Sequence, residues 1–184
     1  MTNKILVFVG MPGSGKSQAV LFLSKKGIPF VRFGQLTDDA IRQRGLPVTP
    51  ENEQVIREEM RQKFSMAAYA IKAKPKIEAL LLSHATIAID GLYSWEEFLF
   101  LKKDFPTLTL IHIFCEPTIR YERLSKREIR PIPLAECYTR DVAEIENLNK
   151  GGAIAIADYC IENSSDDVSN LHEKIDRLLK RLEV

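Results

Sequence analysis

The sequence of 184 residues is poor in cysteine and has no long apolar run. Cys115, Cys137 and Cys160 are widely spaced and form no C-x-x-C pair, which argues against a disulfide framework or a zinc site and favours reduced thiols. No stretch is long enough to span a bilayer. The apolar run at residues 5–9 ends in a glycine-rich turn instead of a cleavage site. We therefore expect a cytoplasmic protein that does not contact membranes.

The sequence also lacks an excess of charge of one sign. Its 26 basic and 25 acidic residues leave a formal net charge of +1, so no global field marks the chain for nucleic acid or an anionic membrane. It contains no internal repeat, low-complexity tract or linker at which to divide it. Because its length suits one domain and 45% of its residues are apolar, we expect a single domain over residues 1–184.

Apolar patterning predicts short strands that alternate with helices. The expected strands cover residues 4–9, 28–33, 86–90, 108–115 and 159–162. The expected helices cover residues 17–26, 37–44, 51–82 with a break at Pro75, 94–103, 117–126, 134–148 and 168–182. This alternation predicts a three-layer α/β fold with helices on both faces of a mainly parallel sheet. A charged helical segment near residues 36–74 and an arginine-rich stretch at residues 120–140 are insertions into this core.

Residues 10–17, the phosphate loop, match the pattern G-x-x-x-x-G-K-S between a predicted strand and a predicted helix. They are Gly10, Met11, Pro12, Gly13, Ser14, Gly15, Lys16 and Ser17. The glycines let backbone N–H groups surround phosphate oxygens, and the helix adds the positive end of its dipole. Lys16 would reach the β- and γ-phosphates, and Ser17 would ligate Mg²⁺. A turn that only joins a strand to a helix needs no lysine followed by a serine, so the pattern predicts binding of ATP or a close relative.

Asp90 ends the predicted strand at residues 86–90. The carboxyl edge of a parallel sheet is where ligands gather, so Asp90 is our candidate for the acidic partner in the magnesium shell. The alternative is that Asp90 only caps the following helix.

Arg120, Arg123, Arg127 and Arg130 recur at three- and four-residue spacing, which on a helix would align their guanidinium groups along one face. One interpretation is a solvated basic face with scattered ion pairs. The other is a closing segment whose arginines offset the charge of a transferred phosphoryl group. Two prolines interrupt the helical pattern after Arg130, as expected for a flap that moves.

Further short motifs that are typical of nucleotide kinases are spread over nearly the whole chain. They are Val31–Gly34, Arg44–Leu46, Pro75–Ile77, Asp90–Gly91, Arg120–Leu124, Arg140–Asp141 and Ala157–Asn163. With the phosphate loop, they give the chain a resemblance to the nucleoside monophosphate kinase branch of P-loop proteins. It resembles more closely the dephospho-coenzyme A kinases and the adenylate-kinase-related proteins.

The resemblance implies a five-stranded parallel sheet, a helical acceptor-binding region at residues 36–74 and an arginine-rich lid at residues 127–136. It also implies that Arg123 lies against the adenine and that Arg127 meets the phosphates. The turn after Asn163 would line the base pocket.

The acceptor side departs from the pattern of such kinases. An acidic residue and then an arginine usually follow the glycine of the acceptor motif, whereas this chain has Gln35 and Asp38. Tyr93 stands where a second arginine normally follows the Asp-Gly pair. Since an aspartate cannot replace a bidentate guanidinium, either another arginine grips the acceptor or the acceptor carries no phosphate there. Asp38 and Asp39 are candidates for a general base only by their place in this segment.

The sequence therefore predicts an ATP- and Mg²⁺-dependent kinase for a small molecule such as a nucleotide or dephospho-coenzyme A. The candidate catalytic residues are Lys16, Arg123 and Arg127, with Ser17 and Asp90 for the metal and residues 10–17, Arg123 and Asn163 for ATP. The alternative is an ATPase or nucleotide switch that acts on a protein partner, which the missing acceptor arginines favour. No N-K-x-D motif follows the predicted strand at residues 108–115, which favours ATP over GTP.

Overall fold

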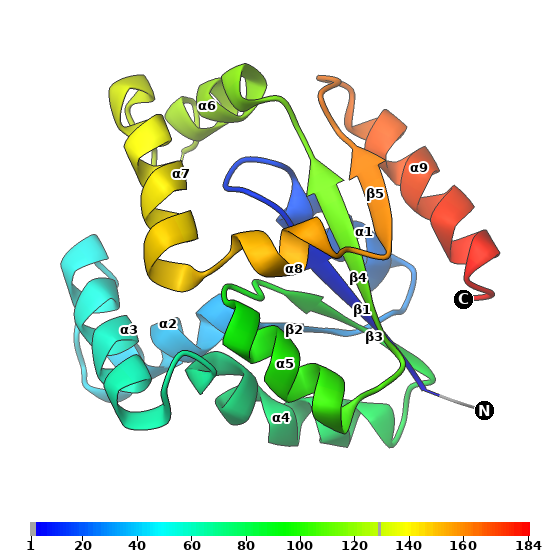
Figure 1. Ribbon diagram of the computed structural model, residues 1–184, viewed down its shortest axis with the longest axis horizontal. Coiled ribbons are helices and arrows are strands. Elements are labelled where there is room, and N and C mark those ends of the chain that lie inside the picture. Colours follow the sequence, from blue (N-terminus) through cyan, green and yellow to red (C-terminus); the bar gives the residue numbers. More distant parts are fainter. Residues whose placement is uncertain (1–2, 129) are drawn as a thin grey trace.

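Five parallel strands form the centre of the structure, a computed structural model that describes residues 3–128 and 130–184 (Figure 1). The strands are β1 (Lys4–Val9), β2 (Phe30–Arg32), β3 (Thr86–Asp90), β4 (Leu108–Phe114) and β5 (Tyr159–Glu162). The helices are α1 (Lys16–Lys25), α2 (Phe33–Gln43), α3 (Pro50–Phe64), α4 (Ala68–Leu81), α5 (Trp95–Asp104), α6 (Pro117–Ser125), α7 (Leu134–Leu148), α8 (Gly151–Ala155) and α9 (Val168–Arg181). The predicted fold class is confirmed.

Successive residues of β1 belong to two separate cores, one on each face of the sheet. Ile5, Val7 and Val9 pack with buried residues of α4 and α5. Leu6 and Phe8 pack with buried residues of α1 and α9. Because both faces are covered, the strand is an unbroken apolar run and not an alternating one. Figure 1 shows the sheet between these helix layers, with α2 and α3 beside one end and α6 and α7 above it.

The strand order β2-β3-β1-β4-β5 places β1 between β3 and β4. The chain leaves β1, builds β2 and β3 on one side, and then crosses to β4 and β5 on the other. Ligands of open parallel sheets bind where the order reverses in this way, beyond the carboxyl ends of the strands. Phe8 of β1 is in register with Asp90 of β3, and Val9 with His112 of β4, so the phosphate loop leaves β1 at this point.

The predicted helical break at Pro75 is wrong. Helix α3 ends at Phe64, where Ser65 takes a left-handed φ of 65°, and Pro75 lies inside α4. A proline in a helix interior removes a backbone hydrogen bond and costs about 3 kcal/mol. Tyr69, Ala73 and Ile77 on the same helix are fully buried in the core, and their packing holds α4 together through the proline.

Two further boundaries differ from the sequence predictions. Strand β2 is short, because fully buried Phe33 already begins α2. Helix α8 was not predicted, since two of its residues are glycines, which disfavour helices. A Cβ atom on Gly152 would lie 2.7 Å from Cε3 of Trp95, so tertiary packing against the indole requires this glycine. None of the described helices has the length and apolar character needed to cross a membrane.

The four arginines do not share one helical face. Helix α6 ends at Ser125, so Arg120 and Arg123 lie on it, whereas Arg127 and Arg130 lie in the connection to α7. The chain turns back here, since Ile132 N donates to Leu124 O at 3.1 Å. The predicted helix at residues 117–126 is therefore observed almost as predicted, and only the alignment of all four arginines on one face is wrong, because Arg127 and Arg130 lie beyond its end.

Candidate functional site

The phosphate loop joins β1 to α1 through glycines in the left-handed region. Gly10, Gly13 and Gly15 have φ of 145°, 79° and 101°, values that favour glycine. Gly15 is the N-terminal cap of α1, and no described side chain bonds the first turn of this helix. The free N–H groups of that turn form a site for an anion.

Lys16, the first residue of α1, folds back over this loop and donates from Nζ to Met11 O at 2.9 Å. Burial lowers the pKa of Lys16 to about 7, and the positive charge of Lys150 adds to this effect. The carboxylates of Asp90 and Glu144 oppose it. Lys16 therefore lies among too few anions to hold its proton firmly, and bound phosphates would supply the missing negative charge.

Ser17 and Asp90 meet in the way the sequence predicts. Ser17 Oγ donates to Asp90 Oδ2 at 3.0 Å. Asp90 does not cap α5, because Ser94 does so in a capping box with Glu97, and the capping interpretation of Asp90 is wrong. Mg²⁺ usually takes one or two protein oxygens together with phosphates and water. The pair fits this donor set, and the described residues hold no group of three or more His, Cys, Asp or Glu that would cage a metal.

Lys150 is a residue of this site that sequence reasoning missed. It follows α7 in the turn before α8 and is 4% exposed. It forms an ion pair with the buried Glu144, and its Nζ lies 5.7 Å from the ring centre of Tyr93. Burial alone would raise the pKa of Glu144, but the charge and hydrogen bond of Lys150, together with the charges of Arg140 and Lys16, lower it. No motif marks Lys150; the Asn-Lys-Gly-Gly turn after a predicted helix was the available signal.

Arg120 has a structural role. Its guanidinium makes a bidentate ion pair with Asp141 of α7, with N–O distances of 3.1 and 2.6 Å. It also donates to Pro12 O at 3.0 Å and to Cys115 O at 3.2 Å. Arg120 thus ties the phosphate loop to α6 and α7, and it is neither solvated nor free to move.

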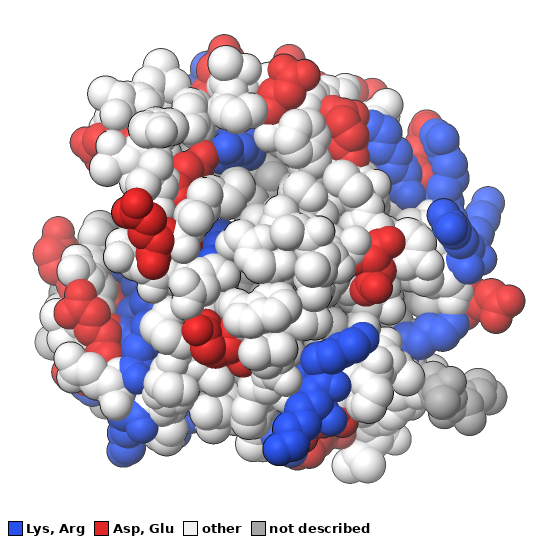
Figure 2. Space-filling model, viewed as in Figure 1, with Lys and Arg blue, Asp and Glu red and all other residues white. Residues whose placement is uncertain are grey.

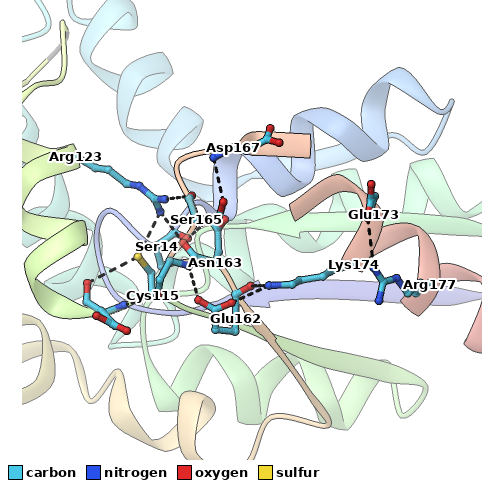
Figure 3. Close-up of polar contacts among 12 residues, drawn as sticks. Ser14, Cys115, Arg123, Glu162, Asn163, Ser165, Asp167, Glu173, Lys174 and Arg177 are labelled. Atoms are coloured by element: carbon cyan, nitrogen blue, oxygen red, sulfur yellow. Dashed lines mark hydrogen bonds and ion pairs between the residues drawn. The ribbon is translucent and has the colours of Figure 1, made fainter. Parts of the chain in front are cut away.

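Arg123 and Asn163 connect α6, the phosphate loop and the turn after β5 (Figure 3). Arg123 donates to Asn163 O at 2.8 Å and to Ser165 O at 2.5 Å. Asn163 Nδ2 donates to Ser14 O at 2.8 Å. A Cβ on Gly15 would lie 2.3 Å from this Nδ2, so Gly15 is also needed for close contact. The predicted contacts of Arg123 and Asn163 with the base remain predictions.

Arg127 is exposed beyond the end of α6. It forms no hydrogen bond or ion pair with any described residue, and Ile129 nearby lies outside the described part of the chain. Desolvation by the surrounding protein and the positive charge of Arg140 lower the pKa of Arg127, whereas Glu144 raises it. Arg127 thus belongs to the same charge environment as the site, and its predicted contact with phosphates remains a prediction.

On the acceptor side, the two base candidates differ. Asp39 is exposed and accepts from Gln35 at 2.8 Å. Asp38 is buried and faces Arg32 and Arg130, with N–O distances of 3.9 and 3.6 Å. Asp39 also pairs with Arg42 on the surface of α2, so of the two only Asp38 is a buried carboxylate that faces Arg32 and Arg130.

The Tyr93 hydroxyl lies close to both Gly91, which follows β3, and Gly34 of α2. A Cβ on Gly91 would lie 3.0 Å from the Tyr93 hydroxyl, and one on Gly34 would lie 3.5 Å from it. Burial raises the pKa of Tyr93, and the negative charge of Asp90 raises it further. The phenol is therefore a neutral group beside the predicted metal ligand. Figure 2 shows acidic and basic side chains interspersed over the visible face.

These features define a P-loop protein with a kinase-like fold. The sequence matches the AAA domain family over residues 6–146. It is 38% identical over 182 residues to a UPF0200 protein of Thermococcus sibiricus, covering 97% of this chain and 95% of that protein. A UPF0200 protein of Pyrococcus abyssi is 33% identical, with 97% and 96% covered. The chain belongs to the UPF0200 family and carries its AAA domain.

Solved structures of the same fold include kinases. A shikimate kinase from Bacteroides thetaiotaomicron aligns with a TM-score of 0.64 at 14% identity, covering 99% of both chains. A gluconokinase from Sinorhizobium meliloti aligns with a TM-score of 0.54 at 17% identity, covering 98% of this chain and 95% of that one. At these identities the likeness shows the fold alone.

Proposed function

We propose that this protein is an ATP- and Mg²⁺-dependent phosphotransferase for a small molecule. The observation that carries the proposal is the assembly of Lys16, Ser17 and Asp90 around an uncapped helix N-terminus at the switch point of the sheet. A triphosphate would accept hydrogen bonds from the free N–H groups and would restore the charge of Lys16. Ser17 and Asp90 would hold Mg²⁺, which neutralises the phosphate oxygens when bound.

Two further cations act on Lys16 through their charge. Lys150 and Arg127 both lower its pKa, and Arg127 is exposed without an anionic partner among the described residues. Phosphoryl transfer depends mainly on positioning and on offsetting charge at the transferred group. This surplus of cations supports Lys16 and Arg127 as catalytic residues, with Lys150 as an additional one. We also propose Arg123 and Asn163 as parts of the ATP site, acting through the turn after β5.

Residues 36–74 are proposed as the acceptor-binding region, and residues 127–136 as the lid, within one domain. Arg130 supports both proposals because it pairs with Asp38 of α2 and with Glu53 of α3. The kinases among the solved structures of this fold include a shikimate kinase and a gluconokinase, and a nucleotide or dephospho-coenzyme A also remains a candidate acceptor.

Product analysis with ATP labelled at the γ-phosphate tests the proposal. The protein is incubated with Mg²⁺ and a panel of nucleotides, nucleosides, sugars and dephospho-coenzyme A. We expect the label to move to one class of small molecule, and Lys16→Ala to abolish most of this transfer. Lys25→Ala, on the exposed last turn of the same helix, is the matched control and should retain it. Label found only in inorganic phosphate, whatever is added, would refute the kinase.

The alternative is an ATPase or switch that acts on a protein partner. The observation in its favour is that Asp38 and Tyr93 occupy positions where acceptor arginines are expected. It predicts that label is released as inorganic phosphate and that a protein partner, and not a small molecule, changes the rate.

A further inference from the structure

Asp38 of α2 and Glu53 of α3 form a buried carboxylate pair on the acceptor side. They are 8% and 6% exposed, and carboxylates are rarely so buried unless they are paired. The cation that both carboxylates share is Arg130, whose Nη2 lies 3.6 Å from Asp38 Oδ1 and also forms an ion pair with Glu53. One guanidinium therefore connects α2, α3 and the segment before α7.

Arg130 approaches the carboxylate pair from outside. Its side chain is 43% exposed, whereas the Glu53 side chain is 7% exposed. Glu53 Oε1 forms its ion pair with this guanidinium and has no other hydrogen-bond partner among the described residues. If the exposed Arg130 side chain swings toward solvent, this oxygen is left to accept a hydrogen bond from another donor.

The carboxylate pair adjoins the donor side through Arg32. Arg32 ends β2, where it is in register with Asp90 of β3. Its Nη1 lies 3.9 Å from Asp38 Oδ2. Arg32 therefore connects Asp38 to the strand next to the one that carries Asp90, the predicted metal ligand.

The charges of this cluster determine which acceptor fits. Without Arg130, the two carboxylates face two guanidinium groups, those of Arg32 and of Arg57, which lies 3.4 Å from Glu53. The cluster is then neutral. A phosphate group placed against the two carboxylates would be repelled. An alcohol hydroxyl fits, because it donates to a carboxylate and accepts from a guanidinium.

We propose that Asp38 and Glu53 form a subsite for an acceptor whose attacking group is an alcohol hydroxyl, and that Arg130 fills this subsite until the acceptor displaces it. The proposal rests on the proposed kinase function and names the class of its acceptor. The hydroxyl oxygen forms a bond to the γ-phosphorus while the bond from this phosphorus to the bridging oxygen breaks. ADP leaves with that electron pair, the hydroxyl proton passes to Asp38, and the displaced Arg130 becomes free to approach the transferred group.

The exchange of Arg130 is tested without knowing the acceptor. Affinity for the Mg²⁺ complex of a non-hydrolysable ATP analogue is measured by calorimetry for wild type, Asp38→Asn and Glu53→Gln. These near-isosteric variants weaken the ion pairs that Arg130 forms with Asp38 and Glu53. In a larger fraction of the protein molecules, Arg130 is then free to bind the phosphates of the analogue. We expect affinity to rise about threefold to tenfold. Adding Arg130→Met to Glu53→Gln should remove the gain.

Matched controls are exposed glutamates that form ion pairs elsewhere on the surface. Glu59→Gln changes a glutamate of α3 that pairs with Arg44, and Glu173→Gln changes a glutamate of α9 that pairs with Arg177. Both should leave the affinity unchanged. Circular dichroism and thermal unfolding confirm that each variant is folded. Unchanged affinity in both folded carboxamide variants would overturn the exchange of Arg130.

The acceptor class is tested by ADP formation with alcohol acceptors (glucose, gluconate, glycerol and dephospho-coenzyme A) and with phosphate acceptors (AMP, CMP and UMP). We expect only alcohols to be phosphorylated, with kcat/KM lowered at least about tenfold by Glu53→Gln, mainly through KM. Phosphorylation of a nucleoside monophosphate alone would overturn this inference and leave the kinase standing. If no compound reacts, the comparison of ATP-analogue affinities among the variants decides whether Arg130 exchanges as proposed. If the protein does not bind the nucleotide, or if Lys16→Ala binds it as tightly as the wild type, both proposals are refuted.

Discussion

The proposed ATP-binding side (the donor side) and the proposed acceptor side of this protein are built in different ways. The donor side is one continuous loop, residues 10–17, with one carboxylate from the neighbouring strand. The acceptor side collects charged side chains from β2, α2, α3 and the segment before α7. The first depends on backbone geometry that a short motif encodes, and the second depends on tertiary packing. A nucleotide-binding loop is therefore far easier to recognise in a sequence than the molecule that receives the phosphate.

The largest effect is expected on the donor side, from Lys16→Ala. Losing one preorganised cation at the transferred group costs about 2 to 4 kcal/mol of transition-state stabilisation, or roughly a hundredfold to a thousandfold in rate. Initial rates of the labelled transfer would measure it. Activity within a few-fold of wild type, in a variant folded by circular dichroism, would remove the phosphate loop from the mechanism.

Glu97→Gln changes the buried first turn of α5 without touching the phosphate loop. Burial raises the pKa of Glu97 to about 8, despite hydrogen bonds from the N–H groups of Tyr93 and Ser94. A raised pKa means that the folded state holds the proton more tightly than the unfolded state. Stability is therefore greatest below the unfolded pKa and is lost as the pH rises toward 8.

We expect the free energy of unfolding of the wild type to fall by on the order of 3 kcal/mol between pH 5 and 8 because of this one group. In Glu97→Gln the decrease should be much smaller. Urea unfolding at several pH values tests this. Parallel pH profiles of the two proteins would show that Glu97 titrates normally.

Asp90→Asn tests the boundary between the two sides. The carboxylate acts through the metal ion, so we expect the Mg²⁺ concentration at half-saturation to rise about tenfold at fixed ATP, while metal-free nucleotide binding changes little. Magnesium titrations of activity and of nucleotide affinity separate the two effects. An unchanged titration would exclude Asp90 from the metal shell.

The smallest expected effect is the pH dependence of nucleotide affinity that arises because Lys16 takes up a proton when phosphates bind. Its pKa is about 7 in the free protein, and bound phosphates should raise it, so nucleotide affinity should be highest below pH 7 and fall above it. Between pH 7 and 8.5 the decrease should be about threefold to tenfold. Calorimetry in buffers of different ionisation enthalpy would detect the proton, and Lys16→Arg, which stays charged, should show none.

The strands and most helices follow from the sequence because they are long apolar periodic runs. Helix α7 matches its predicted bounds, and β1, β3 and β5 do as well. The break between α3 and α4 was predicted at Pro75 because proline disfavours helix interiors. In the structure, burial of α4 outweighs this local preference, and the break lies before α4 instead. The prediction that the four arginines share one helical face was wrong because the chain turns back after Ser125.

Within the site, the pairing of Ser17 with Asp90 was predictable, because parallel strand ends meet at one edge of the sheet. The roles of Arg120 and Lys150 were not. Arg120 forms its ion pair with Asp141, which is 21 residues away in the sequence. Lys150 lies in a turn that matches no known motif. The partnership of Arg130 with Asp38 and Glu53 joins three separate segments, and no spacing rule connects them.

Hydrogen exchange tests the central claim, that the donor side is formed in advance and the acceptor side closes only over both substrates. The protein is compared in three states: free, with ATP, and with an analogue that joins adenosine to an alcohol acceptor through a phosphate chain. We predict that ATP alone protects mainly residues 10–17, and that the joined analogue also protects residues 36–74 and 120–140. Full protection of all these segments by ATP alone, with nothing added by the acceptor, would contradict the kinase and favour a nucleotide-driven switch.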